Sequence, residues 1–168
     1  MSCMDKYAGL EYEVVVLKYS DHIARICVLH TGNTEDAKDC FQNTFLKLYI
    51  TEKVFEDEEH LKAWLLRVAV NECRDYHRTL WKRKVKLGLS IEEKEAWSGK
   101  DEIVCSEECI DVMEKLQMIP QKYREVLYLY YFEEYDTKEI AEILTISINT
   151  VKSRLKRGRE RLLEEIEC

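Results

Sequence analysis

Basic residues gather in two segments of an otherwise acidic chain. The 168 residues include 26 lysines and arginines and 33 aspartates and glutamates, which gives a net charge of −7. Six basic residues and a single acid nevertheless lie between positions 74 and 86, and the same balance recurs between 152 and 161. Phosphate groups respond to the local field rather than to the net charge, so both segments are candidates for contact with nucleic acid.

The second basic segment has the pattern of a helix-turn-helix. Asp136 begins a helix with Glu139 three positions later, a capping-box arrangement. A tight connector then ends at Ser147, which can cap a second helix. The outer face of that helix is polar and basic, as in helices that contact base edges and phosphates, although an ordinary helical hairpin with a solvated basic face is the alternative. The residues predicted to face DNA are Ser147, Asn149, Thr150, Lys152, Ser153, Lys156 and Arg157.

A second polar row lies on a helix predicted from about residue 60 to 82. Apolar residues recur there every three or four positions, so one face packs inward, and Trp64 is expected on that face. The polar residues beside it are Lys62, Arg67, Asn71, Arg74 and Arg78. This row is the second candidate surface for nucleic acid.

Helices must position both rows, and the composition favours helices throughout. Five glycines and one proline, with 46% hydrophobic residues, argue against a turn-rich β fold. The periodicity predicts a first helix over 10–30, with a break near Ser20, and a second from a cap at Asn33 or Thr34 to about Tyr49. Later helices are predicted over 110–118, 121–132, 137–144 and 148–165. The first helix is expected to bury Val14, Leu17, Ile23, Ile26, Val28 and Leu29.

The helical pattern stops over residues 86–108, which are acidic and contain glycine and serine. We therefore predict an all-α protein with two helical domains, 1–85 and 109–168, joined by a flexible linker at 86–108. The C-terminal domain contains the helix-turn-helix.

Several classes of protein are disfavoured. No run of about 18 apolar residues is present and the N-terminus lacks the pattern of a signal peptide, so we expect a cytoplasmic protein without membrane insertion. The seven cysteines are irregularly spaced, which favours free thiols over disulfides or a metal site. The four histidines form no motif with the acids, so a metal-dependent nuclease has no support. No cofactor and no catalytic residue is expected.

Three stretches resemble the sigma factors of bacterial RNA polymerase. TEDAKDCFQNTFLKLY (34–49) resembles the signature of sigma region 2, and HLKAWLLRVAVNECRDYHR (60–78) resembles the segment that melts and reads the −10 promoter element. IPQKYREVLYLYYFEEYDTKEIAEILTISINTVKSRLKRGRERL (119–162) resembles region 4, which reads the −35 element. A short linker stands where larger sigma factors have a further domain, as in the extracytoplasmic-function (ECF) group.

The resemblance implies a non-catalytic specificity subunit that binds core polymerase through the β′ clamp helices and the β flap. Asp36, Asp39 and Gln42 would dock on the clamp helices, and Asn71 would capture a flipped base of the −10 element. Phe55 would line that base pocket, or would instead be a loop residue packed against the core. An anti-sigma factor, in many members membrane-anchored, is an implied partner, with the protein at the nucleoid when active.

The alternative function is a stand-alone helix-turn-helix repressor or activator. Such proteins normally dimerise to read paired half-sites. The chain shows no extended heptad seam and no ligand domain, which disfavours this alternative.

Overall fold

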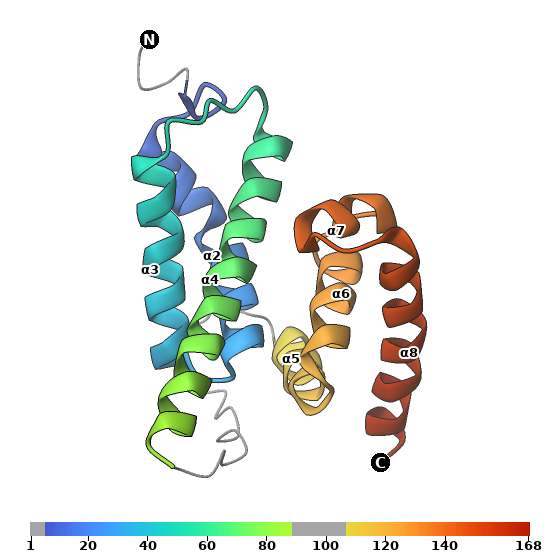
Figure 1. Cartoon of the computed structure of the whole chain (residues 1–168). Helices are drawn as coiled ribbons and strands as arrows, with labels where there is room; N and C mark the ends of the chain where they lie inside the picture. The colour runs from blue at the N-terminus through green and yellow to red at the C-terminus, as the bar shows by residue number, and fades with distance from the viewer. Residues whose placement is uncertain (1–5, 89–106) are drawn as a thin grey trace. The chain divides into compact units, whose positions relative to one another are not determined.

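The computed structural model describes residues 6–88 and 107–168, with side chains in the second range from residue 111 onward. All regular elements in these ranges are α-helices (Figure 1). The chain divides into two compact units, Met1–Glu95 and Ala96–Cys168. The predicted all-α fold is therefore confirmed. Most of the predicted linker, residues 89–106, lies outside the described residues, and its flexibility stays a prediction.

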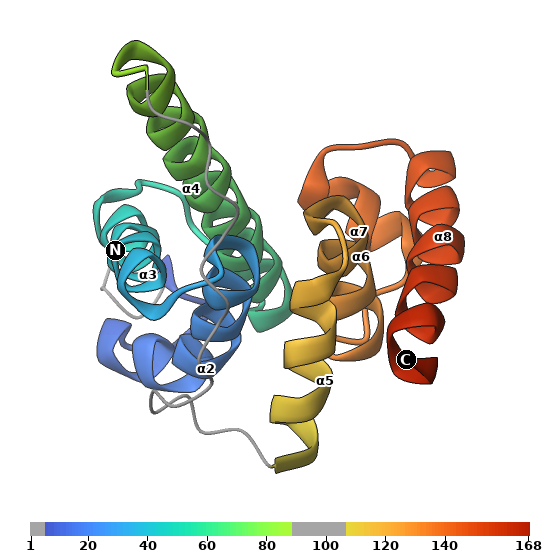
Figure 2. The same ribbon diagram turned by 90° about the horizontal axis from the view of Figure 1, so that it is seen from below.

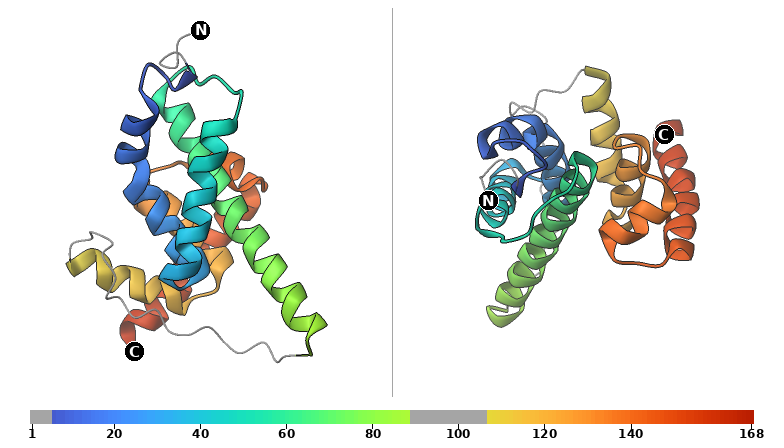
Figure 3. Two further views of the ribbon diagram at one scale, coloured as in Figure 1. Left: turned by 90° about the vertical axis from the view of Figure 1, so that its left-hand side faces the viewer. Right: turned by 90° about the horizontal axis from the view of Figure 1, so that it is seen from above.

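Three helices build the first unit: α2 (Tyr12–Thr31), α3 (Thr34–Ile50) and α4 (Glu58–Lys86). They lie side by side, and the C-terminal part of α4 extends beyond the other two (Figures 2 and 3). Gly32 ends α2 in the left-handed conformation with φ of 77°. Asn33 then caps α3, because its side chain accepts a hydrogen bond of 2.8 Å from the Asp36 N–H.

The inward face of α2 differs from the predicted one. Val14 and Leu17 are 44% and 80% exposed, so their predicted burial is wrong, and Val15 and Tyr19 are buried instead. The predicted break near Ser20 is also absent, because α2 is continuous. The Ser20 hydroxyl donates to the Leu17 carbonyl one turn back, which keeps this polar side chain compatible with a helix.

Phe55 belongs to the core of the first unit. It is 1% exposed, and its ring meets Trp64 edge-on with centroids 5.3 Å apart. The Phe55 N–H donates to the Lys6 carbonyl at 3.0 Å, which fixes the loop between α3 and α4. Of the two roles considered for Phe55, the packed loop residue is the one observed.

Four helices build the second unit: α5 (Glu107–Met118), α6 (Gln121–Tyr131), α7 (Thr137–Leu144) and α8 (Ile148–Glu167). The predicted capping box is present, since Asp136 accepts from the Glu139 N–H and the Glu139 carboxylate accepts from the Asp136 N–H. Ser147 caps α8 by accepting from the Thr150 N–H at 3.1 Å. The predicted helix-turn-helix therefore corresponds to α7 and α8.

Gly158 allows α6 and α8 to approach closely. A Cβ atom built on Gly158 would lie 3.1 Å from Leu127 Cδ1 and 3.3 Å from Tyr123 Cβ. Nine in ten real Cβ contacts are wider than this, so Leu127 and Tyr123 would have to shift by a few tenths of an ångström to accept a side chain here. The close approach sets the position of α8 against α6.

Candidate nucleic-acid interface

The predicted DNA-facing row of α8 lies on the outside of the second unit. Val151 and Leu155, at 0% and 3% exposure, anchor the opposite face in the core. Among the predicted residues Thr150 is half-buried and the others are exposed, namely Ser147, Asn149, Lys152, Ser153, Lys156 and Arg157. The structure therefore brings all seven residues to α8 and its N-cap and leaves them accessible.

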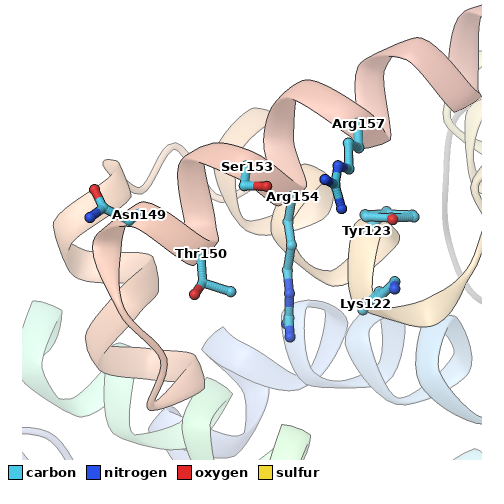
Figure 4. A pocket seen from close by; sticks show the side chains of 7 residues that line it. All are labelled: Lys122, Tyr123, Asn149, Thr150, Ser153, Arg154 and Arg157. Carbon is cyan, nitrogen blue, oxygen red and sulfur yellow. The ribbon is translucent and has the colours of Figure 1, made fainter.

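A pocket of about 370 Å³ lies beside this row, between α8 and the start of α6 (Figure 4). Two of its lining residues, Lys122 and Tyr123, come from α6 and were not predicted to belong to a site. They follow Pro120 in the first helical turn, and only the packing of α6 on α8 shows that this turn lies beside the predicted DNA-facing row. The α8 residues of the lining are Asn149, Thr150, Ser153, Arg154 and Arg157.

The charges at the pocket are unevenly balanced. Arg154 Nη1 lies 3.1 Å from Glu125 Oε1, and the Glu125 side chain is only 3% exposed, so this pair offsets one positive charge. Lys122 Nζ lies 5.0 Å from the centre of the Tyr123 ring. Desolvation acts to raise the pKa of Tyr123, but a hydrogen bond with Arg157 and the positive charge of Lys122 outweigh it and lower this pKa. The pocket mouth is thus electropositive.

The polar row of α4 also reaches the surface. At about 100° per residue, Arg67, Asn71, Arg74 and Arg78 fall within a stripe about 60° wide. Arg67, Asn71 and Arg78 are exposed and Arg74 is half-buried. The remaining predicted residue, Lys62, lies about 140° round the helix from Arg67, so it does not join this stripe.

The stripe continues beyond the residues that were predicted. Trp81 and Val85 are each 53% exposed and fall within about 40° of Arg67 around α4. Trp81 and Val85 follow Arg78 by three and seven residues, and this helical spacing in the sequence could have predicted that they share its face. We call the row Arg67, Asn71, Arg74, Arg78, Trp81 and Val85 the α4 stripe.

The three residues predicted to bind polymerase are not equivalent. Asp39 and Gln42 are exposed on α3, whereas Asp36 is half-buried and accepts a hydrogen bond of 2.5 Å from the Tyr76 hydroxyl. Desolvation and this bond raise the pKa of Tyr76. Asp36 therefore links α3 to α4. The exposed face of α3 continues from Asp39 and Gln42 into three large apolar residues, Leu46, Tyr49 and Ile50.

Cysteine chemistry and membrane insertion gain no support from the described residues. Cys27, Cys40 and Cys73 are buried free thiols, and Cys168 is an exposed one. Among the described residues no cluster of histidine, cysteine and acidic side chains could hold a metal ion. None of the helices in residues 6–88 and 107–168 has the length and apolar character needed to span a membrane.

Family models match both units. Residues 15–83 match sigma-70 region 2, and residues 109–162 match sigma-70 region 4. The ECF RNA polymerase sigma factor SigW of Bacillus subtilis is 32% identical over 161 residues, covering 88% of this chain and 84% of SigW. The RNA polymerase sigma-E factor of Streptomyces coelicolor is 32% identical over 160 residues, covering 94% of this chain and 86% of the relative.

Solved structures share the fold. The sigma factor RpoE of Bartonella quintana, in complex with the anti-sigma factor NepR, superposes with a TM-score of 0.71 at 23% identity, covering 93% of this chain and 96% of RpoE. CnrH, in complex with the cytosolic domain of CnrY, gives a TM-score of 0.63 at 22% identity, covering 93% and 87%.

The chain belongs to the sigma-70 family, in its ECF group. It is therefore an RNA polymerase sigma factor, a class of protein that confers promoter specificity on the polymerase. The resemblance drawn from the sequence is confirmed, and the stand-alone repressor is not favoured.

Proposed function

We propose that α8 reads the −35 element as duplex DNA. The observation that carries this proposal is the exposed polar row of α8 above a buried anchor, at the second helix of a helix-turn-helix. Side chains near the start of such a helix reach base edges, and the cations beside them hold phosphates. The residues assigned to the −35 element are Ser147, Asn149, Thr150, Lys152, Ser153, Lys156 and Arg157.

The α4 stripe reads the −10 element when this DNA opens into single strands. Cations hold the backbone of a single strand, and an amide such as that of Asn71 can pair with the edge of an extruded base. Arg67, Arg74 and Arg78 supply the positive charge, and Trp81 extends the surface. Phe55 has no part in this surface while its ring is packed in the core. Lys62 lies about 140° round α4 from Arg67, so we leave it out of this surface.

Core polymerase binds to both units. On the first unit, Asp39 and Gln42 of α3 provide polar contacts to the β′ clamp helices, with Asp36 positioned between α3 and α4. The adjoining Leu46 and Tyr49 support a protein-binding face, because large apolar side chains at 56% and 63% exposure gain free energy when a partner covers them. The second unit binds the β flap. Neither contact needs to be strong alone, because once one unit is bound the linker keeps the other unit at a high effective concentration near its own site.

The protein acts in the cytoplasm, reaches the nucleoid when active, and is held inactive by an anti-sigma factor, which a membrane anchor keeps at the membrane. Support comes from the two structural neighbours, each solved with a partner that is an anti-sigma factor or a cytosolic domain. The chain itself performs no catalytic step. Its contribution is to select the promoter and to stabilise the opened strand.

Run-off transcription tests this function. Purified bacterial core polymerase and this protein are combined on the DNA upstream of the protein's own gene. A discrete transcript that requires the protein would support the assignment and would locate the start site. Absence of a transcript and of co-elution with core polymerase, together with tight duplex binding by the protein alone, would contradict it and favour a repressor.

A further inference from the structure

We propose that the pocket between α6 and α8 binds a backbone phosphate of the −35 duplex, and that Lys122 and Tyr123 of α6 contact it. This inference rests on the proposed function, because it assumes that α8 faces promoter DNA. It adds a second helix to the interface and assigns its residues to positioning the duplex rather than to reading its sequence.

The lining of the pocket has the chemistry that a phosphodiester needs. Its seven residues include no carboxylate and offer hydroxyl, amide, ammonium and guanidinium donors. Glu125 offsets Arg154, which leaves the charges of Lys122 and Arg157 available to an anion. Figure 4 shows Arg157 above the Tyr123 ring and Lys122 below it, so the two cations flank the phenol. An anion at the mouth of the pocket would contact both Lys122 and Arg157.

The start of α6 adds to this field. Pro120 occupies its N-cap and provides no side-chain hydrogen bond, and the first turn of this fully described helix contains no acidic residue. The positive end of the helix dipole is therefore not offset by a carboxylate within its own first turn. Anions bind at helix starts of this kind when other donors converge on the same point, and the lining residues of the pocket supply those donors.

The pocket is held in shape before any ligand arrives. Tyr123 is 8% exposed, and the absence of a side chain at Gly158 lets its Cβ approach α8. The ion pair between Arg154 and Glu125 joins the same two helices. A preformed site avoids the entropy cost of ordering its side chains on binding. This rigidity suits a contact that fixes the register of a helix on the duplex.

The salt dependence of promoter binding tests the assignment. Holoenzyme made with wild-type protein, Lys122→Gln or Tyr123→Phe is titrated with promoter DNA at several salt concentrations. Losing one phosphate contact should reduce the slope of log Kobs against log salt by about 0.9 for Lys122→Gln. The ratio of the wild-type binding constant to that of Lys122→Gln should then be roughly 3.5-fold larger at 50 mM than at 200 mM salt. Lys115→Gln on α5, outside the pocket, is the matched control and should keep the wild-type slope.

A second experiment identifies the phosphate. Single uncharged methylphosphonates are placed in turn along both strands of the −35 element. One position should weaken binding of wild type and have little further effect on Lys122→Gln, because both changes remove the same contact. Tyr123→Phe should weaken binding to all −35 sequences equally. Preference among these sequences should be unchanged in both variants, as expected of a backbone contact.

Three outcomes would overturn the proposal. The first is an unchanged salt slope in Lys122→Gln, and the second is an altered preference of either variant among −35 sequences. The third is that the effects of Lys122→Gln and of the methylphosphonate on binding simply add at every position tested. Saturable binding of inorganic phosphate next to Lys122 and Tyr123, together with an unchanged slope, would assign the pocket to a free anion instead. Wild-type run-off transcription separates these failures from failure of the proposed function, because it would still give a transcript.

Discussion

Asn71 is the side chain on which the proposed reading of the −10 single strand most depends. Asn71→Ala removes the amide but keeps α4 helical, because alanine is the best helix former. We expect open-complex formation, followed by permanganate reactivity of unpaired thymines, to fall about tenfold, since a lost amide–base pair is worth roughly 1–3 kcal/mol. Closed-complex binding should change little, because Asn71 meets its base only after extrusion.

Thr79→Ala serves as the control for Asn71→Ala. Thr79 is exposed on the same helix and lies outside the α4 stripe, so neither step should change. Equal loss of closed and open complexes in Asn71→Ala would show that the residue helps duplex binding or folding instead, and the role in base capture would have to be given up.

Cys40 and Cys73, in the core of the first unit, should be inert in the folded protein. A hydrogen bond with Cys73, together with burial, raises the pKa of Cys40. A hydrogen bond with Cys27 and burial raise the pKa of Cys73, although its bond with Cys40 acts in the opposite direction. A raised pKa keeps the thiol protonated, and the thiolate is the reactive form.

Alkylation by iodoacetamide, mapped by mass spectrometry, checks this prediction about the thiols. Exposed Cys168 should be modified, whereas between pH 7 and pH 9 Cys40 and Cys73 should stay unmodified until denaturant is added. Modification of Cys40 or Cys73 in the native state at pH 7 would mean that the first unit opens readily, and a redox role would then deserve study.

At the scale of the helices, the pair of Arg154 and Glu125 joins α8 to α6. Arg154→Ala removes the ion pair that Arg154 makes with the buried Glu125 carboxylate, and removing one member of a buried pair costs about 3 kcal/mol. Urea unfolding followed by circular dichroism should show this loss in the transition of the second unit. Glu125→Gln added to Arg154→Ala should recover part of the stability, because it removes the buried charge.

Arg159→Ala is the matched control for Arg154→Ala. Arg159 lies on the same helix and donates to the Tyr131 hydroxyl of α6 at 2.6 Å, but it is exposed. Water can replace such a bond, so the expected cost is at most about 1 kcal/mol. Similar losses in the two variants would mean that burial of Glu125 is not what makes the pair important.

Helix ends were more predictable from the sequence than helix faces. The caps at Asn33, Asp136 and Ser147 depend on local hydrogen bonds. Asp136 and Ser147 were predicted, and Asn33 was one of the two residues considered for its helix. The face of α2 depends on which of four consecutive apolar residues, 14–17, points inward, and a continuous apolar run does not specify that phase. Tertiary packing selected Val15 and exposed Leu17.

Among the site residues too, those that depend on local sequence were predictable and those that depend on tertiary packing were not. The α8 row was predictable because one helix carries it at helical spacing. The position of Lys122 beside this row was not predictable, because it requires knowing how α6 packs on α8, and Gly158 and the ion pair of Arg154 with Glu125 contribute to that packing. Phe55 shows the same limit: the sequence left open a base contact or packing against the core, and in the fold its ring is buried.

At the scale of the whole molecule, each unit has its own buried core. Leu61, Leu65 and Leu66 are fully buried in the first unit, and Leu127 and Val151 are at most 1% exposed in the second. Under the proposed function, the protein has two separate contacts to polymerase and two to DNA, with one tether between them. Its promoter selectivity then depends on both units binding together.

Changing the tether tests this dependence. Expressing residues 1–95 and 96–168 as separate chains should lower promoter-dependent transcription by about 10²-fold or more at equal concentrations, because the second binding event is no longer intramolecular. A flexible 20-residue Gly-Ser insertion within the predicted linker should cost only about threefold, since effective concentration falls roughly as the −3/2 power of tether length. The same segment appended after Cys168 is the control and should have no effect. An insertion as damaging as the cut would indicate that the units must be held in one fixed arrangement, whereas a harmless cut would show that each unit binds strongly by itself.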